Sequence, residues 1–304
     1  RSSLEGLRPG ANSVASLTNF QPPMFCVLTS GESEQDQCAI DEIVQYLIDK
    51  KITALELNLL LPNDPATGLI LESLRSRGQR VQTFENEFMV FEDVSGTSFD
   101  DYWKTRTSRL RNTHKRREKQ LAKTGEIRFE MIQKPSDVDR GIESYNQVFG
   151  VCWKDAEQFP EFTPGLMHAA AESGALRLGI LFLDEQPISA QLWLVSGGVA
   201  SILKLHYVDD YKKYSPGTIC SHHMMRHVID VDNVKEIDFG GGTSTYKKWW
   251  MHNERKMVTL VSFNPKTARG LFCFSLFSMS KARNYLREQL AKHIIRPLRK
   301  WRSS

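Results

Sequence analysis

The sequence of 304 residues has few features of disulfide-rich, zinc-binding or membrane-spanning proteins. Its five cysteines are an odd number and include no Cys-x-x-Cys pair, so their spacing argues against a disulfide framework and a zinc cluster. We expect reduced thiols in a cytosolic protein. No run reaches the roughly 18 consecutive apolar residues of a membrane helix. The apolar stretch Gly270–Met279 is only about half as long as that minimum.

Motifs for nucleotide and metal chemistry are also missing. The triplet Gly240-Gly241-Gly242 has neither the spacing nor the lysine of a phosphate-binding loop. His223 and His227 have a spacing that can bind zinc on a helix, but no acidic residue lies between them and no third ligand is evident. We therefore expect no metal site, and we expect Cys220 on the same helix to pack in the core.

The bulk composition fits a globular protein with room for two domains. The net charge is +4, with 40% hydrophobic and 25% charged residues, and this mildly basic balance does not by itself predict nucleic-acid binding. The sequence starts at Arg1-Ser2-Ser3 without an initiator Met or an apolar signal core, so the numbering could begin inside a longer chain.

The first third of the sequence alternates between two periodicities. Short apolar or alternating runs predict strands, and apolar residues three and four apart predict helices. The expected strands are Met24–Thr29, Ile52–Leu60 and Arg80–Phe91, and the expected helices are Ile40–Lys51 and Pro65–Arg77. This alternation is typical of an α/β fold.

A strongly basic segment follows. Ser98 with Asp100 and Asp101 predicts a helix N-terminus, because acidic groups there oppose the helix dipole, and the helix is expected to run to Lys123. It could bind tRNA phosphates, an anionic polymer or a membrane face, or it could be a solvated linker. Its nine basic residues are Lys104, Arg106, Arg109, Arg111, Lys115, Arg116, Arg117, Lys119 and Lys123.

The second half predicts a fuller set of elements. Three strands in close succession, separated by short turns, indicate an antiparallel sheet. The expected order is strand Glu126–Gln133, helices Pro135–Phe149 and Thr163–Glu172, strands Leu176–Leu183, Ile188–Val195 and Val199–Val208, helix Pro216–Ile229, strand Lys235–Phe239, helix Ser244–His252, strand Met257–Phe263 and a basic helical tail from Lys266 to Trp301.

One loop in this half has the features of an anion site. In Tyr214-Ser215-Pro216-Gly217-Thr218, a proline can occupy the first helical turn and a glycine lets a ligand approach the backbone. Free N–H groups at a helix start attract anions, and Lys212 and Lys213 add positive charge. A pyrophosphate would suit this loop. The alternative is an ordinary turn between a strand and a helix.

The order of elements from Glu126 to Phe263 resembles the acyl-CoA N-acyltransferase (GNAT) fold. The loop departs from that family's pattern, because it has one glycine and a proline. From Phe99 on, shorter motifs resemble the acetyltransferase branch linked to bacterial cellulose biosynthesis, which is related to FemABX-type aminoacyl transferases. These motifs are Cys152-Trp153-Lys154, Ala190-Gln191-Leu192-Trp193, Tyr214-Ser215-Pro216-Gly217, Asp238-Phe239-Gly240-Gly241-Gly242 and Tyr246-Lys247-x-Trp249.

The resemblance implies an α/β (α+β) fold with a mixed central sheet flanked by helices and two GNAT-like halves. We expect a reduced first half at 1–97, a basic linker helix at 98–125, a complete acyltransferase domain at 126–265 and a helical tail at 266–304.

The resemblance also implies roles for individual residues. His206 and Asp238, at strand ends, are candidate bases, and Tyr246 is the candidate acid for the leaving thiolate. The alternative for His206 is a half-buried histidine without a catalytic role. For Asp238 it is a structural acceptor for the Gly240–Gly242 amides, and for Tyr246 it is a packed aromatic ring. We assign acyl-CoA binding to Lys212, Lys213, Tyr214, Ser215, Gly217 and Thr218, and substrate binding to Trp153, Lys154, Gln191 and Lys247.

Three functions remain in consideration. The first is acyl-CoA-dependent, acetyl-type transfer to an amine such as an amino sugar or a cell-envelope or polysaccharide precursor. The second is FemABX-like transfer from aminoacyl-tRNA, and the third is a non-catalytic role in binding a polymer or partner. We expect a cytoplasmic protein, with peripheral association at the inner membrane face as the alternative. The sequence does not identify the acceptor.

Overall fold

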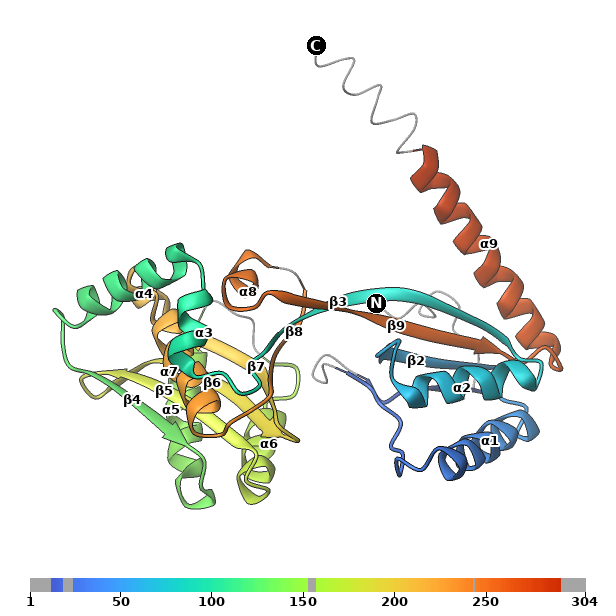
Figure 1. Ribbon diagram of the computed structural model, residues 1–304, viewed down its shortest axis with the longest axis horizontal. Coiled ribbons are helices and arrows are strands. Elements are labelled where there is room, and N and C mark those ends of the chain that lie inside the picture. The colour runs from blue at the N-terminus through green and yellow to red at the C-terminus, as the bar shows by residue number, and fades with distance from the viewer. Residues whose placement is uncertain (1–11, 19–23, 153–156, 243, 291–304) are drawn as a thin grey trace, which may run out of the picture. The chain divides into compact units, whose positions relative to one another are not determined.

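The computed structural model describes residues 12–18, 24–152, 157–242 and 244–290. The chain folds into two compact units, which we describe separately. Unit 1 comprises residues 1–87 and 256–304, and unit 2 comprises residues 88–255 (Figure 1). The strands β3 (Arg80–Asp93) and β9 (Asn253–Phe263) each contribute residues to both units.

Unit 1 is a small sheet with helices on both faces. In addition to parts of β3 and β9, it contains β1 (Ser13–Ala15), α1 (Ser33–Asp49), β2 (Ala54–Leu60), α2 (Pro65–Ser76) and α9 (Ala268–Leu290). Strand β2 pairs in parallel with β1 and antiparallel with β9. Side chains of α1 and α2 pack with Leu55, Leu57 and Leu260, whereas α9 packs with Ala54 and Phe263.

Two expectations in this unit needed correction. The strand expected at Met24–Thr29 is wrong, because these residues have no strand assignment, although the Phe25 amide donates to the Leu59 carbonyl at 2.9 Å. The helix expected from Ile40 starts earlier, at Ser33. Its first turn is polar and is anchored by Asp36, whose carboxylate accepts hydrogen bonds from the amides of Ser30 and Gly31. An apolar periodicity does not reveal such a start.

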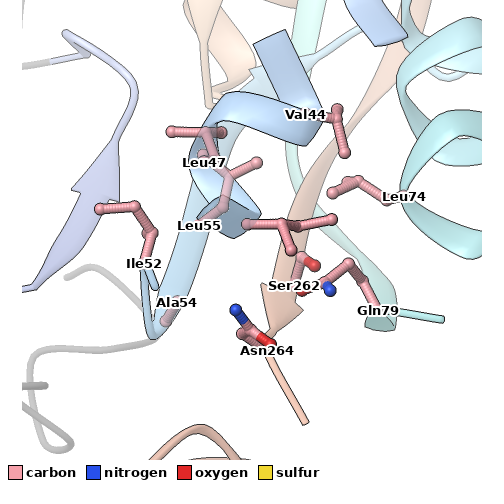
Figure 2. Close-up of a pocket in the computed structure, with 10 residues that line it drawn as sticks. Val44, Leu47, Ile52, Ala54, Leu55, Leu74, Gln79, Ser262 and Asn264 are labelled. Atoms are coloured by element: carbon pink, nitrogen blue, oxygen red, sulfur yellow. The ribbon is translucent and has the colours of Figure 1, made fainter. Parts of the chain in front are cut away.

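A cavity of about 20 Å³ lies inside unit 1, between the helices and the ends of β2 and β9 (Figure 2). Apolar side chains such as Val44 and Leu74 form much of its wall. Three buried polar atoms also line it, Gln79 Nε2, Ser262 Oγ and Asn264 Nδ2, and they have no hydrogen-bond partner among the described residues. A cavity of this size and polarity suits one water molecule and is too small for a substrate.

Unit 2 contains a six-stranded sheet in the order β3-β8-β7-β6-β5-β4. Adjacent strands are antiparallel except for β7 and β8, which are parallel. The mixed α/β class and the order of elements expected from Glu126 onward are therefore confirmed. The elements are β4 (Ile127–Ile132), α5 (Val138–Gly150), α6 (Phe162–Glu172), β5 (Leu176–Leu183), β6 (Gln186–Ser196), β7 (Val199–Tyr207), α7 (Pro216–Asp230), β8 (Glu236–Gly241) and α8 (Thr245–Trp250).

The helices of unit 2 cover both faces of its sheet (Figure 1). On one face, α5 and α6 pack against side chains such as Leu178 and Leu192. On the other face, α7 packs against side chains such as Leu181 and Trp193. A Cβ atom at Gly179 would lie 2.3 Å from the sulfur of Met224, so glycine allows α7 to lie close to β5.

The basic helix expected from Ser98 to Lys123 is instead two helices, α3 (Phe99–Thr105) and α4 (Ser108–Leu121). Arg106 has an extended backbone between them, and its buried guanidinium contacts Glu92 and the Trp250 carbonyl. The Thr107 hydroxyl then caps α4 by accepting from the Leu110 amide. Composition could not reveal this break, because Arg106 looks like the other eight basic residues in the sequence. Only its tertiary contacts distinguish it.

None of the helices in the described part of the chain is long and apolar enough to cross a membrane.

Candidate functional site

The candidate site of unit 2 begins where two parallel strands separate. Strands β7 and β8 pair at Val199–Glu236, Ala200–Ile237 and Ser201–Asp238, and no further pair between them is seen in the described residues. Beyond Ser201, β7 continues to Tyr207, while β8 continues to Gly241 alongside β3. Beyond Ser201 the edge of β7 that faced β8 therefore has no strand partner among the described residues, and strand ends of this kind are where open sheets bind ligands.

A β-bulge lies where the strands separate. Leu192 pairs with Lys204 and Trp193 pairs with Ile202, so Leu203 is the extra residue on β7. A bulge bends its strand and increases its local twist. The extra residue lies two positions after Ser201, the last residue of β7 that pairs with β8, so the bend and the end of the pairing coincide.

The loop expected to bind pyrophosphate leads from β7 into α7. Ser215 has φ +53° immediately before Pro216, a left-handed conformation that non-glycine residues adopt rarely. The amide of Ser215 donates to the Lys212 carbonyl, and the amide of Thr218 donates to the Ser215 carbonyl. Pro216 has no N–H, so this loop presents fewer amides than its position at a helix start predicts.

Other features of the loop fit an anion. Lys212 and Lys213 are exposed, and Lys213 Nζ lies 5.0 Å from the centre of the Tyr214 ring. A Cβ atom on Gly217 would lie 3.4 Å from Tyr207, which is an ordinary contact, so the fold itself does not require glycine here. The cofactor-binding roles of these residues stay predictions.

A buried hydrogen-bond network connects this loop to β6 and α8. Gln191 Nε2 donates to the Gly217 carbonyl and to Ser221 Oγ, both at 2.9 Å. Gln191 Oε1 accepts from Trp193 Nε1 at 3.1 Å, and Ser221 Oγ lies 3.3 Å from the Tyr246 hydroxyl. The network thus joins Gln191, Gly217 and Tyr246, which are predicted substrate, cofactor and catalytic residues.

Tyr246 keeps its proton in this position. Burial raises the pKa of its phenol, although the neighbouring Ser221 hydroxyl acts in the opposite direction. The ring has edge-to-face contacts with Phe239 and Trp249. A neutral phenol at the open end of the sheet can donate a proton to a developing anion.

His206 lies on the other face of β7. It pairs with Ala190, whose side chain packs in the α5 and α6 core, whereas the adjacent Gln191 points toward α7. His206 is 3% exposed; its Nε2 lies 2.9 Å from the Tyr145 hydroxyl and its Nδ1 lies 3.7 Å from Cys152 Sγ. His206 and Tyr246 therefore flank β7 from opposite faces.

An ion pair shares the face of His206. Lys204 Nζ donates to Glu157 Oε1 at 2.6 Å, and the Thr163 hydroxyl donates to the other carboxylate oxygen at 2.6 Å. Burial acts to raise the pKa of Glu157, but Lys204 and Thr163 more than offset this effect and lower it. The carboxylate and ammonium together could bind a polar acceptor.

The remaining predicted residues mostly shape the end of β8. Asp238 accepts from the Gly240 amide at 2.6 Å, lies 3.3 Å from Arg255, and has a pKa raised by burial. Lys247 Nζ donates to the carbonyls of Phe239 and Gly241. Their catalytic and substrate roles stay predictions. Trp153 and Lys154 lie outside the described residues.

Sequence reasoning missed several residues of this region. Ser221 lies four residues after Gly217. Because residues four apart lie on the same face of a helix, the predicted helix starting at Pro216 would already have placed Ser221 beside the loop glycine. The lysine at 204 in an otherwise apolar strand was a visible signal. Glu157 and Tyr145 gave no signal, because their contacts depend on the tertiary fold.

The histidines of α7 have other partners than a metal. His222 stacks on His114 of α4, with 3.9 Å between the ring centres, and His223 stacks on Phe129. His227 Nε2 lies 3.1 Å from Gln133 Nε2. Within the described residues, no group of three or more His, Cys, Asp and Glu side chains could hold a metal ion.

Residues 108–248 match the family model described as an acetyltransferase (GNAT) domain. This part of the chain is a GNAT domain. The match runs from the start of α4 into α8, and it therefore includes the strand separation, the α7 loop and Tyr246. The GNAT class indicates a transferase. No curated protein sequence matches the chain.

Solved structures with a similar fold have low sequence identity. FemX has a TM-score of 0.56 and 11% identity, covering 81% of this chain and 83% of that one. A Bacillus licheniformis structure named L-PGS has a TM-score of 0.52, 12% identity and coverages of 80% and 77%. The C-terminal domain of an Agrobacterium fabrum protein described as a lysylphosphatidylglycerol synthetase has a TM-score of 0.52, 11% identity and coverages of 77% and 76%. These similarities concern the fold alone.

Proposed function

We propose that the GNAT domain catalyses transfer of an acyl group, most simply acetyl, from acyl-CoA to an amine acceptor. The observation that carries this proposal is the separation of β7 from β8 at Ser201, next to the bulge at Leu203. A thioester lying along the free edge of β7 would have backbone amides within reach of its carbonyl oxygen. Lys212, Lys213 and the Gly217 amide would bind its phosphates.

The side chains have distinct roles in this proposal. The acceptor nitrogen attacks the thioester carbonyl, a C–N bond forms and the C–S bond breaks. Tyr246 donates its phenolic proton to the departing sulfur, and His206 accepts a proton from the acceptor nitrogen. Lys204 and Glu157 would orient a polar acceptor, such as an amino sugar or a cell-envelope or polysaccharide precursor.

The test is acyl transfer by the full chain, using acetyl-CoA, a panel of amino sugars and mass spectrometry of the product. We expect Tyr246→Phe to lower kcat by about 100-fold with little change in the KM for acetyl-CoA, since one proton transfer contributes about that much. Tyr46→Phe in unit 1, which removes an exposed hydroxyl, is the matched control. Gly217→Val should prevent acyl-CoA binding without unfolding unit 2. Absence of acyl-CoA binding by calorimetry would refute the proposal.

A second donor, aminoacyl-tRNA, is favoured by one observation on α4. The helix packs on α7 through Leu110 and His114, and it exposes five basic side chains. Its one acidic residue, Glu118, is half-buried near His114. A surface of this kind suits a phosphate backbone. The five exposed residues are Arg109, Arg111, Lys115, Arg116 and Lys119.

Filter binding of charged tRNA at two salt concentrations tests this second donor. If α4 binds phosphates, replacing Arg111, Lys115 and Lys119 with serine should make the slope of log affinity against log salt concentration less steep. The change should correspond to the loss of about one to three phosphate contacts. Transfer of the aminoacyl group to an amine would then replace acyl-CoA turnover. Equal binding by the variant and the wild type would exclude α4 as the tRNA site.

A further inference from the structure

Helix α9 packs on unit 1 with only one of its faces. Cys273 and Phe277 are buried against the sheet, and the Phe277 ring lies 5.5 Å from the ring of Phe263 and 6.1 Å from that of Phe84. The Ser278 hydroxyl accepts a hydrogen bond from Gln82 Nε2 at 3.4 Å. These contacts fix which side of α9 faces away from unit 1.

The outward side of α9 carries large apolar side chains, with the exposed Ser275 among them. Leu271, Phe272 and Met279 are 47%, 62% and 68% exposed. Their spacing of one, seven and eight residues places them within about 100° on the helix surface. In the sequence, apolar residues continue after Met279 at intervals of three and four, at Ala282, Leu286 and Leu290. Three large exposed apolar side chains on one side of an already packed helix are more than isolated exposed hydrophobic residues require.

The part of the sequence that contains α9, residues 266–304, has a strongly positive net charge. Residues 266–304 contain ten Lys and Arg residues and one Glu, which gives a net charge of +9. The whole chain carries +4, so the other 265 residues carry −5. Arg269, Arg283 and Arg287 belong to α9 itself. An apolar stripe with flanking basic residues is the pattern of helices that lie in a membrane interface.

We propose that α9 binds the surface of an anionic lipid bilayer. Its outward apolar side chains enter the boundary between headgroups and acyl chains, and its basic residues contact anionic headgroups. In a pair of chains joined along this stripe, two α9 helices would lie side by side, each with four basic residues and one Glu, a net charge of +3, and this repulsion opposes pairing. A nucleic acid would satisfy the charge but would leave Phe272 and Met279 in water. This inference concerns unit 1 and does not depend on the acyl donor.

Vesicle flotation of the full chain tests the proposal. We use vesicles of phosphatidylcholine alone and vesicles with about 30% phosphatidylglycerol, in 0.1 M and 0.5 M NaCl. We expect binding to the anionic vesicles at least tenfold tighter than to the neutral ones, and weaker binding in high salt because surface charges are screened. Phe272→Glu and Met279→Glu should each reduce binding to anionic vesicles at least tenfold.

The matched control is Ile43→Glu, which places the same charge at a 55% exposed apolar position on helix α1 of the same unit. Circular dichroism verifies the fold of each variant, and Phe272→Ser repeats the test without an added charge. Equal binding to neutral and anionic vesicles would overturn the proposal, and so would unchanged binding by Phe272→Glu. A dimer in solution that Phe272→Glu dissociates would also overturn it, in favour of a second copy of the chain.

Discussion

Replacing Gln191 with leucine tests whether the network behind the α7 loop stabilises unit 2. The Gln191 side chain is fully buried and makes hydrogen bonds to the Gly217 carbonyl, Ser221 and Trp193. Leucine has a similar size but cannot make these bonds. Trp193 Nε1, which is also buried, would then lose its partner, at a cost of about 1–3 kcal/mol. Loss of the other two bonds adds about 1 kcal/mol each, and the apolar gain of leucine offsets about 1 kcal/mol.

The expected net destabilisation of about 3 kcal/mol corresponds to a roughly 150-fold change in the opening equilibrium. Hydrogen exchange followed by mass spectrometry measures it, since peptides from β5 to β7 should exchange about that much faster. Peptides from β2 and α2 in unit 1 are the internal control. Gln186→Leu is the matched variant, because Gln186 is exposed on the same strand and makes one hydrogen bond, with Tyr211. If Gln191→Leu changes exchange less than fivefold, the network does not stabilise the loop.

Three further predictions concern stability, measured by thermal unfolding. Glu92→Leu should cost about 3–5 kcal/mol, because the guanidinium of Arg106, which is 2% exposed, loses its carboxylate; recovery in the double variant with Arg106→Leu would confirm the cause. Burial lowers the pKa of His114 to about 4, below its unfolded value, so stability should fall as the pH drops from about 6.5 towards 4, by up to about 3 kcal/mol. His114→Phe should reduce that slope but not remove it, because burial also lowers the pKa of His222, to about 3; an unchanged slope would contradict the assignment. Ser262→Ala should change stability by less than about 1 kcal/mol, because no described residue bonds its hydroxyl; a larger loss would reveal a bound partner.

Regular periodicity accounts for the parts of unit 2 that could be predicted. The alternating runs of β5, β6 and β7 and the Pro-Gly start of α7 determine their elements through local chemistry, and the structure confirms them. Local patterns failed where a tertiary contact decides the backbone. Arg106 lies at the break between two helices, where its guanidinium binds Glu92 of the preceding strand and the Trp250 carbonyl. The bulge at Leu203 likewise follows from pairing between strands, which no single run of residues encodes.

The candidate site could be predicted as a set of residues but not as an arrangement. His206 and Tyr246 were expected to act together, yet they approach β7 from opposite faces. In a continuous sheet, the backbone would separate a base on one face from an acid on the other. In our proposal the end of the β7–β8 pairing at Ser201 removes that obstacle, because a carbonyl group lying between the two strands would be approached by the acceptor from the His206 face and by Tyr246 from the α7 face. The strand separation is therefore the feature on which the proposed acid and base both depend, and in this proposal the α7 loop would keep the donor between the two strands.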